Sequence, residues 1–406
     1  MGKSGVKAIL IVTSVLLGYP LIVITKGNAE RDDLTRKLTA YTEGLLNEDE
    51  NSNNEPVVSK FPATDNIRQI PNETFVRPLR NGRAIVIADT SGQVDKVAKA
   101  LTEYRRGNPC KKFLLCTDEC DAMFRTEEHT QAFERAYDDL VRLRPCAHVL
   151  VSATPLPALI HLANEELVDG IPVVLCDITP NDDYVGLADM KPFRLDGRPV
   201  YLEDDELKSK RVFKFSVEGE EYRIPSCSKN LRDFYAFAIA SKGRGVLLLD
   251  CTMHLVKKEE INVKIKAERV QLYAHAVLNK HVAVFTNTGG MGLEVKLSTG
   301  EPWIKEKELN NPIGNSDGSE DTMLGKVIQF IHTSVGPEVP IFAFGFHKMF
   351  RSNSYRSSDR VPTHAIVSLG EFHNGSTVTQ ALGRATFNGK QWGQAVSPPT
   401  YQITSY

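Results

Sequence analysis

The stretch that decides the fold is FLLCTDECD, Phe113–Asp121. Its first half is a short apolar run, which is typical of a buried strand. Asp118 and Glu119 then lie at the end of this strand, at the rim of a sheet, where open α/β sheets bind their ligands. Two adjacent carboxylates there are suited to hold Mg²⁺ and to orient or deprotonate an attacking water. The alternative is a solvent-exposed strand end or a helix N-cap.

Strands and helices alternate along the rest of the chain, with polar turns where strands end. This alternation predicts an α/β fold with two doubly wound parallel sheets. The other strands that we expect are Leu21–Thr25, Ala84–Ala88, His148–Val151, Val173–Cys176, Gly245–Asp250, Val282–Phe285, Ile341–Phe344 and Ala365–Leu369.

The composition along the chain suggests how the two sheets are connected. Residues 47–67 are acidic and rich in Asn, which predicts a flexible insertion. Val212–Phe215 and Glu221–Ile224 predict a β-hairpin between the domains. We also expect residues 302–320 to be irregular. The predicted division is domain 1 at 1–178, a linker with the hairpin at 179–228, domain 2 at 229–390 and a tail without elements at 391–406.

Charge and cysteine usage limit the classes of function. The 406 residues carry a formal net charge of −2, so contact with nucleic acid would have to be local. The seven cysteines contain no CxxC pair and lie mostly in apolar runs. They predict reduced thiols in an intracellular protein, with neither disulfides nor a structural metal.

The N-terminal run Ala8–Thr25 is almost wholly apolar and follows two lysines. One interpretation is a signal anchor or a single membrane span. Gly18 and Pro20 interrupt the run, however, and favour a buried helix Gly5–Leu17, a turn and a buried strand. We therefore expect a soluble protein, with membrane anchoring through residues 8–25 as the alternative.

The chain opens with Met1-Gly2-Lys3-Ser4-Gly5, and a helix follows at once. Gly-Lys-Ser before a helix is the second half of a P-loop, in which backbone N–H groups cradle phosphates. The earlier glycine and its strand are absent from the sequence, which predicts an N-terminally truncated domain. In isolation this tripeptide is also common by chance.

Two further motifs follow in order. Ser152-Ala153-Thr154 ends a predicted strand, and Thr154 precedes a proline as a helix cap would. Gln380-x-x-Gly383-Arg384 lies on the last predicted helix, where a surface arginine is the ordinary interpretation.

Taken together in this order, the four motifs resemble those of superfamily 2 helicase-like ATPases with two RecA-like domains. Gly345–Arg384 is most similar to helicase-like ATPases of the restriction and DNA-repair type. The resemblance implies ATP and Mg²⁺ as cofactors and hydrolysis coupled to movement on DNA or RNA. Phe387 stands where many relatives have a further arginine. A helicase-like scaffold without catalysis is the alternative, and a membrane-anchored protein is the third.

The resemblance also implies residue roles. Gly2, Lys3 and Ser4 would bind the phosphates, Ser4 and Asp118 would hold Mg²⁺, and Glu119 would activate water. Asp121, Ser152, Ala153 and Thr154 would couple hydrolysis to movement. Gln380 and Arg384 would reach the γ-phosphate across the cleft, with Arg384 as an arginine finger and Arg351 as a second candidate.

Three small polar turns at strand ends are candidates for nucleic-acid contact. Their backbone N–H groups suit phosphates, and such binding is independent of sequence and sensitive to salt. The ordinary interpretation is that they only connect strands to helices. The residues are Lys26, Gly27 and Asn28, then Thr90, Ser91 and Gly92, and finally Thr286 and Asn287 within 286–290.

Overall fold

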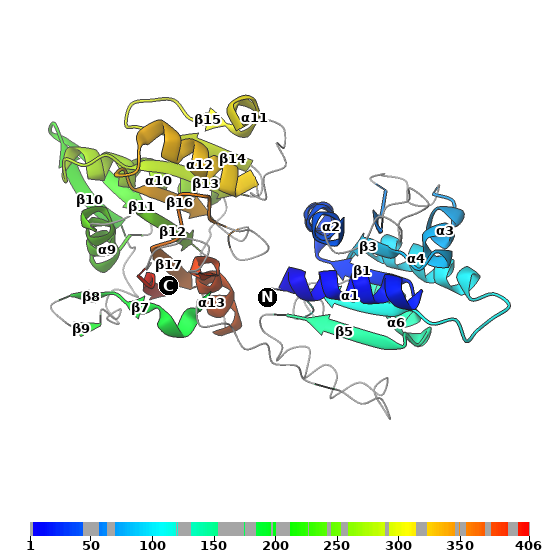
Figure 1. Cartoon of the computed structure of the whole chain (residues 1–406). Coiled ribbons are helices and arrows are strands. Elements are labelled where there is room, and N and C mark those ends of the chain that lie inside the picture. The colour runs from blue at the N-terminus through cyan, green and yellow to red at the C-terminus, as the bar shows by residue number, and fades with distance from the viewer. Residues whose placement is uncertain are drawn as a thin grey trace. The chain divides into compact units, whose positions relative to one another are not determined.

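A computed structural model gives the fold, and it divides into two compact units, Met1–Ile178 and Thr179–Tyr406 (Figure 1). Each unit holds its own sheet and its own hydrophobic core. The structure describes residues 3–43, 57–62, 70–118, 120, 131–152, 174, 184–195, 198–199, 212–225, 227–241, 245–252, 259–288, 292–313, 323–345, 349, 355–369, 375–388 and 397–405.

The first unit is built on a five-stranded sheet in the order β2-β3-β1-β4-β5, and every pair in it is parallel. Its central strands β1, β3 and β4 are buried at every residue and mostly apolar, because helices cover both faces of a parallel sheet. The strands are β1 (Leu21–Thr25), β2 (Val58–Lys60), β3 (Ala84–Ala88), β4 (Leu114–Asp118) and β5 (Ala147–Val151).

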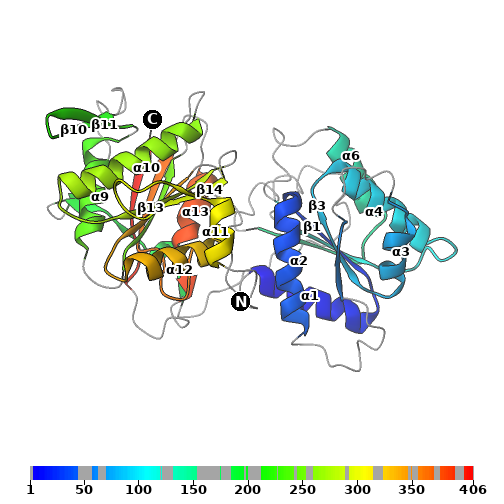
Figure 2. The ribbon, with the colours of Figure 1, turned by 90° about the horizontal axis from the view of Figure 1, so that it is seen from above.

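The helices of this unit form two layers, with α1 and α2 on one face and α3, α4 and α6 on the other (Figure 2). Alternate residues of β1 serve the two layers, since Val23 packs with Ile11 of α1 while Ile24 packs with Val97 of α4. The helices are α1 (Lys3–Leu17), α2 (Gly27–Glu43), α3 (Glu73–Arg80), α4 (Ser91–Tyr104) and α6 (Gln131–Arg142).

The apolar N-terminal run divides as predicted into a helix, a turn and a strand. Helix α1 ends at Leu17, and Gly18 takes a φ of 65°, a left-handed conformation that glycine adopts without steric penalty. Strand β1 then starts at Leu21. Within the described part of the chain, we find no helix with both the length and the apolar character that a bilayer crossing requires.

The second unit is built on an eight-stranded sheet in the order β15-β14-β13-β16-β12-β17-β19-β7. From β13 to β7 the neighbouring strands are parallel, whereas β14 and β15 extend the sheet as antiparallel strands. The strands are β7 (Lys191–Pro192), β12 (Leu247–Thr252), β13 (Ala283–Thr288), β14 (Gly292–Lys296), β15 (Ile304–Lys305), β16 (Ile341–Gly345), β17 (His364–Leu369) and β19 (Thr400–Ser405).

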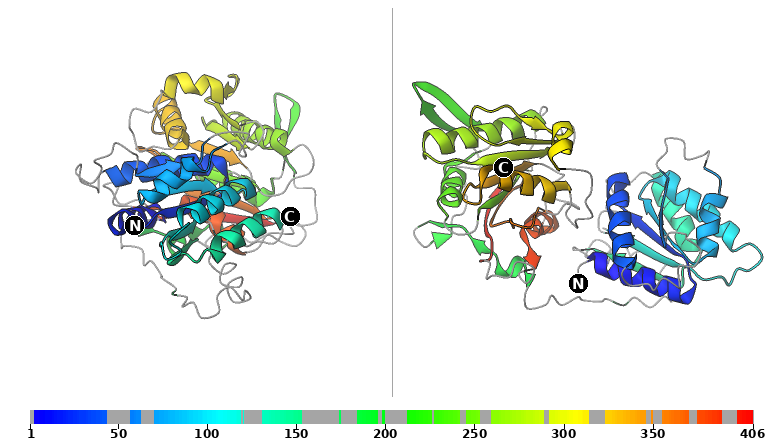
Figure 3. Two further views of the ribbon diagram at one scale, coloured as in Figure 1. Left: turned by 90° about the vertical axis from the view of Figure 1, so that its right-hand side faces the viewer. Right: turned by 45° about the horizontal axis from the view of Figure 1, so that its top comes forward.

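Helices again cover both faces of this sheet (Figure 3). One layer contains α9 (Lys229–Ala240) and α10 (Glu259–Ala276), and the other contains α11 (Glu306–Ile313), α12 (Met323–Val335) and α13 (Gly375–Leu382). Helix α13 continues into the short 3₁₀ helix η6 (Gly383–Ala385).

The predicted hairpin is present as β10 (Val212–Val217) and β11 (Glu220–Pro225), and it packs against α10. Phe215 meets the Tyr273 ring edge-on at a centroid distance of 5.5 Å. Five further short elements belong to this unit: β6 (Tyr184–Val185) pairs with β18 (Phe387–Asn388), β8 (Arg194–Leu195) pairs with β9 (Arg198–Pro199), and η4 spans Leu187–Asp189.

The predicted fold class, two α/β units that are each built on a largely parallel sheet with helices on both faces, is confirmed. Four local predictions are wrong. The insertion at 47–67 contains β2, the irregular segment 302–320 contains β15 and α11, and the tail contains β19. Thr286 and Asn287 belong to β13, which runs on and pairs with β14, rather than to a turn. The predicted strand Val173–Cys176 lies outside the described residues except for Val174.

Candidate functional site

The carboxyl ends of three neighbouring strands meet at one edge of the first sheet. Strand β4 ends at Asp118, its neighbour β1 ends at Thr25, and β3, on the far side of β1, ends at Ala88. Ser152 directly follows β5, the strand on the other side of β4. This edge is where parallel sheets bind ligands. The fold therefore brings Asp118 to the same sheet edge as two of the predicted phosphate-binding turns.

Asp118 is not free at this edge, because the Lys7 ammonium of α1 pairs with its Oδ2. Lys7 and Asp118 are only 3% and 7% exposed. The other carboxylate oxygen, Oδ1, is buried without a hydrogen-bond partner. The sequence analysis missed Lys7. The available signal was its place four residues after Lys3, on the helix face that packs against the sheet.

The described donors do not fit a divalent cation at Asp118. Mg²⁺ takes oxygen ligands in near-octahedral geometry, and here a single carboxylate oxygen remains beside a buried ammonium of like charge. Within the described ranges, no three His, Cys, Asp or Glu side chains come together as a metal-binding group. The side chain of Ser4, the other predicted Mg²⁺ ligand, is outside the description, although its backbone lies in the first turn of α1.

The turns after β1 and β3 are joined to each other by hydrogen bonds. The Gly27 N–H donates to Asp89 Oδ1 at 2.8 Å, and the Asp89 N–H donates to the Thr25 carbonyl at 2.8 Å. Gly27 has a φ of 73° and is the first residue of α2, so Gly27 and Asn28 belong to this helix and not to the predicted turn. The Asp89 carboxylate therefore already satisfies one of the N–H groups that we expected to bind phosphate.

Asn28 extends this connection. Its Oδ1 accepts hydrogen bonds from Arg31 at 3.0 Å and from Gln93 Nε2 at 2.8 Å. The buried Gln93 accepts the Ala88 N–H at 2.8 Å through its own Oε1, which fixes α4 to the end of β3. The hydroxyl oxygen of Thr90, just before α4, is buried without a partner. Sequence reasoning missed Asp89 and Gln93 because each acts on a residue of another element, and it missed Arg31, whose partner Asn28 lies one turn earlier in α2.

Behind Asp118, three polar side chains hold α6 and β5 against β4. Thr117 Oγ1 lies 3.2 Å from the Tyr137 hydroxyl and 3.0 Å from His148 Nε2, and the Tyr137 hydroxyl lies 3.1 Å from the same nitrogen. Burial raises the pKa of Tyr137 and lowers the pKa of His148 to about 4. The three groups are therefore uncharged at neutral pH, and they fix the strand position next to Asp118.

In the second unit, Gln380 lies on α13 and Arg384 on η6. Gln380 is buried, and Arg384 is partly exposed. Burial raises the pKa of Cys251 and of Tyr355, and the positive charge of Arg384 opposes both rises. Arg384 therefore lies close to the carboxyl end of β12, which carries Cys251.

The third predicted phosphate-binding segment is buried in the second unit. The Asn287 Nδ2 donates to the Tyr355 hydroxyl at 2.9 Å, and both residues are under 10% exposed. The hydroxyl oxygens of Thr286 and Thr288 are buried without partners. The nucleic-acid role of Thr286 and Asn287 remains a prediction, on a strand and not on a turn.

Several predicted site residues fall outside the part of the chain that the structure describes. They are Gly2, Glu119, Asp121, Ala153, Thr154 and Arg351. Of Lys3 and Ser4 only the backbone is described, in α1. The roles of all eight residues therefore remain predictions.

Comparison with known proteins gives similarity of structure alone. No protein-family model matches the chain, and no curated protein matches it either. Saccharomyces cerevisiae Dbp5, solved with RNA and ADP-BeF3, aligns over 100% of this chain and 76% of its own, with 12% identity and a TM-score of 0.48. The helicase MrfA, solved with DNA and AMPPNP, aligns over 97% of this chain and 43% of its own, with 11% identity and a TM-score of 0.49.

Mycobacterium smegmatis helicase Lhr, solved with single-stranded DNA and AMP-PNP, aligns over 95% of this chain and 40% of its own, with 11% identity and a TM-score of 0.42. The chain is similar to these proteins in fold alone, with an identity of at most 12%. It spans less than half the length of MrfA and of Lhr.

Proposed function

We propose that the chain is a nucleotide-dependent helicase or translocase that acts on DNA or RNA. The observation that carries the proposal is the single sheet edge in the first unit. At this edge Asp118, which has one unpartnered oxygen, ends β4, the strand next to β1. The turns after β1 and β3, which hydrogen bonds join to each other, lie at the same edge. Such an edge can receive phosphate groups and a reacting water.

The proposal assigns five roles to residues of the two units. Gly2, Lys3 and Ser4 bind the nucleotide phosphates at the start of α1, and Glu119 activates the attacking water. Lys26–Asn28 and Thr90–Gly92 contact the nucleic-acid backbone, supported by their position at the N-termini of α2 and α4. Gln380 and Arg384 of the second unit act on the γ-phosphate. Asp121 and Ser152–Thr154 couple hydrolysis of the nucleotide to movement on the nucleic acid.

ATP hydrolysis in the presence of single-stranded DNA or RNA tests this proposal. We expect hydrolysis that nucleic acid stimulates and that Glu119→Gln abolishes, because the amide cannot take a proton from water. Glu134→Gln, on an exposed position of α6, is the matched control and should leave the rate unchanged. An active Glu119→Gln protein would remove this site assignment.

A second candidate is a nucleic-acid-binding scaffold without nucleotide turnover. The observation that favours it is the Lys7–Asp118 pair, which neutralises the acid on which metal-assisted hydrolysis would depend. The two candidates differ in one measurement, the affinity for a labelled single strand with and without ATP. A scaffold would bind equally well in both conditions, whereas a motor would change its affinity with the nucleotide.

A further inference from the structure

The pair of Lys7 and Asp118 crosses the first unit from helix α1 to strand β4. The residues lie 111 positions apart in the sequence, and both side chains are at least nine-tenths buried. Buried ions are retained in proteins when each has a partner of opposite charge. Lys7 therefore gives Asp118 the positive charge that its buried carboxylate needs.

The position of the pair gives it a consequence for metal binding. Asp118 is the predicted Mg²⁺ ligand, and an ammonium now lies in hydrogen-bonding contact with its Oδ2. A lysine ammonium is a compact point charge that repels a second cation nearby. Lys7 already balances the charge of the Asp118 carboxylate. A divalent ion at Asp118 would therefore find no net negative charge, and the Lys7 ammonium would repel it.

The unpartnered Oδ1 of Asp118 is the second observation. A carboxylate offers about four acceptor positions, and Lys7 uses one oxygen only. Oδ1 is therefore the atom that a cation would coordinate if Lys7 were withdrawn. The ammonium of Lys7 thus contacts one oxygen of the Asp118 carboxylate, Oδ2, and the other oxygen, Oδ1, has no partner.

We propose that Lys7 is a built-in cation that excludes divalent metal from Asp118, so that Mg²⁺ reaches this carboxylate only when Lys7 leaves it. Lys7 thereby determines the metal specificity of the site. The inference rests on the proposed function only in locating the nucleotide site near Asp118. The exclusion itself needs neither nucleotide nor hydrolysis.

Binding of Mn²⁺ to the nucleotide-free full chain, followed by electron paramagnetic resonance, tests the inference. We compare the wild type with Lys7→Met, Asp118→Asn and the double variant. Lys7→Met should bind Mn²⁺ at least about tenfold more tightly than the wild type, since it removes the ammonium and leaves the negative charge of Asp118 available to the metal. The double variant should lose this gain. Lys99→Met, which removes an exposed lysine paired with Asp95, is the matched control and should behave as the wild type does.

One comparison does not depend on whether Lys7→Met folds. The wild type and Asp118→Asn should give the same Mn²⁺ titration, because Lys7 already keeps metal away from Asp118. Weaker Mn²⁺ binding by Asp118→Asn than by the wild type would overturn the inference. So would a folded Lys7→Met protein with no gain in Mn²⁺ affinity. Because nucleotide is absent from every sample, a chain that never hydrolyses ATP would still give a decisive result.

Discussion

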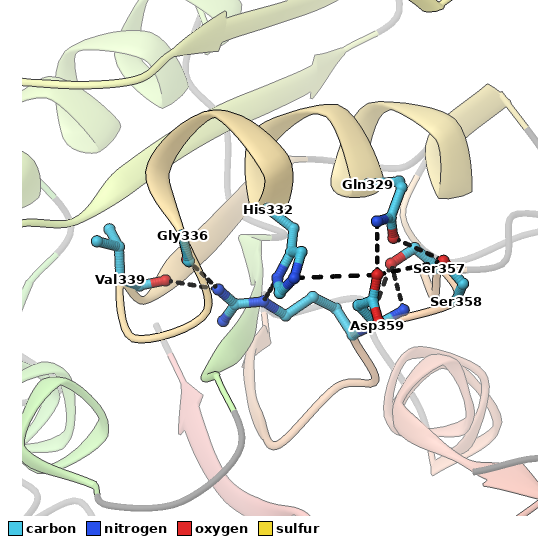
Figure 4. Close-up of polar contacts among 8 residues, drawn as sticks. Gln329, His332, Gly336, Val339, Ser357, Ser358 and Asp359 are labelled. Carbon is cyan, nitrogen blue, oxygen red and sulfur yellow. Dashed lines mark hydrogen bonds and ion pairs between the residues drawn. The ribbon is translucent and has the colours of Figure 1, made fainter.

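Arg360 donates a hydrogen bond from its Nε to Nδ1 of His332 at 2.9 Å, which joins the loop before β17 to helix α12 (Figure 4). The imidazole can accept this bond only when Nδ1 carries no proton, so the ring is neutral with its proton on Nε2. Burial, together with the Arg360 charge, lowers the pKa of His332 accordingly. The same guanidinium donates to the carbonyl groups of Val246, Gly336 and Val339 at 3.0 to 3.2 Å.

The first prediction concerns Arg360, which is 1% exposed. Arg360→Met should lower the free energy of unfolding by about 3 kcal/mol or more, because buried carbonyl groups lose their donors. Arg360→Lys keeps the charge but not the fork of donors, so its loss should be intermediate. The measurement is urea unfolding. Arg356→Met, on an exposed position of the same loop, should change stability by less than about 0.5 kcal/mol.

The second prediction concerns the pH dependence of stability. Burial lowers the pKa of His364 to about 4, against 6.5 ordinarily, and the ring lies between Phe237 and the Thr363 hydroxyl. Its unfolded state therefore binds a proton first as the pH falls. The stabilising contribution of His364 is complete above about pH 6.5 and is lost progressively toward pH 4.

Unfolding measured at pH 7 and pH 5 checks this contribution. His364 should account for about 2 kcal/mol of the stability that the wild type loses between these values. His364→Gln cannot titrate, so its free energy of unfolding should fall correspondingly less over the same interval. Equal pH dependence in both proteins would contradict the assignment.

The strands that could be predicted from sequence are those whose pattern is purely local. Strands β1 and β3 are five-residue apolar runs, Leu21–Thr25 and Ala84–Ala88, between polar or turn-forming residues, and their predicted bounds agree with the structure. Strand β2 has only three residues, and β19 carries Thr400, Gln402 and Thr404 between its apolar positions. Both strands form because the edge of a neighbouring strand, β3 or β17, supplies backbone groups for hydrogen bonding. The local sequence of β2 and β19 does not indicate that edge.

The candidate site divides in the same way. Asp118 could be predicted, because an acid directly after an apolar run has a recognisable place at a sheet edge. Asp89 could not be assigned from the sequence, because it acts on a residue 62 positions away, and Lys7, although it lies one helical turn after Lys3, has its partner 111 positions away. Asn287 was placed on a turn because polar residues are common there, and its buried partner Tyr355 is 68 residues away.

The third prediction concerns the buried pair of Asp250 and Lys266 in the second unit. Lys266 Nζ lies 2.9 Å from Asp250 Oδ2, and the Tyr235 hydroxyl donates to the same oxygen. Lys266→Met should destabilise the protein by about 3 to 5 kcal/mol, because it removes a buried positive charge from a buried carboxylate. Lys266→Met combined with Asp250→Asn should recover part of that loss. A double-mutant cycle by urea unfolding measures the coupling, and additive effects would exclude it.

The fourth prediction concerns the charge at the predicted nucleic-acid contact. Asp89 holds the Gly27 N–H and places a negative charge where phosphates are expected. Asp89→Asn keeps an oxygen for this hydrogen bond and removes the charge. Affinity for a single-stranded polynucleotide should rise roughly threefold at low salt and return to the wild-type value at high salt.

Fluorescence anisotropy with a labelled strand checks this effect of Asp89. Asp95→Asn is the matched control, because Asp95 lies on α4, the helix that follows Asp89, and pairs with the exposed Lys99. Equal gains from both variants would mean that only the overall charge of the unit matters. No gain from Asp89→Asn would place the nucleic acid elsewhere.

The last prediction separates a catalytic from a structural role for Arg384. A planar guanidinium stabilises the charge of a transferring phosphoryl group, and loss of such an arginine reduces hydrolysis by about 10³-fold or more. Arg384→Ala should show this loss in nucleic-acid-stimulated ATP hydrolysis. Arg384→Lys should not restore the rate, because an ammonium lacks the planar fork of donors. Arg223→Ala, on the exposed hairpin, should leave hydrolysis unchanged.

A structural role would give a different result. Arg384 lies near Cys251 and Tyr355, so its removal could change packing at the end of β12. Parallel urea unfolding of the same variants detects such a change. If Arg384→Ala lowers stability and hydrolysis together, and Arg384→Lys recovers both, the residue holds the fold of the second unit. If stability is unchanged while hydrolysis falls in both variants, the guanidinium acts on the phosphoryl group.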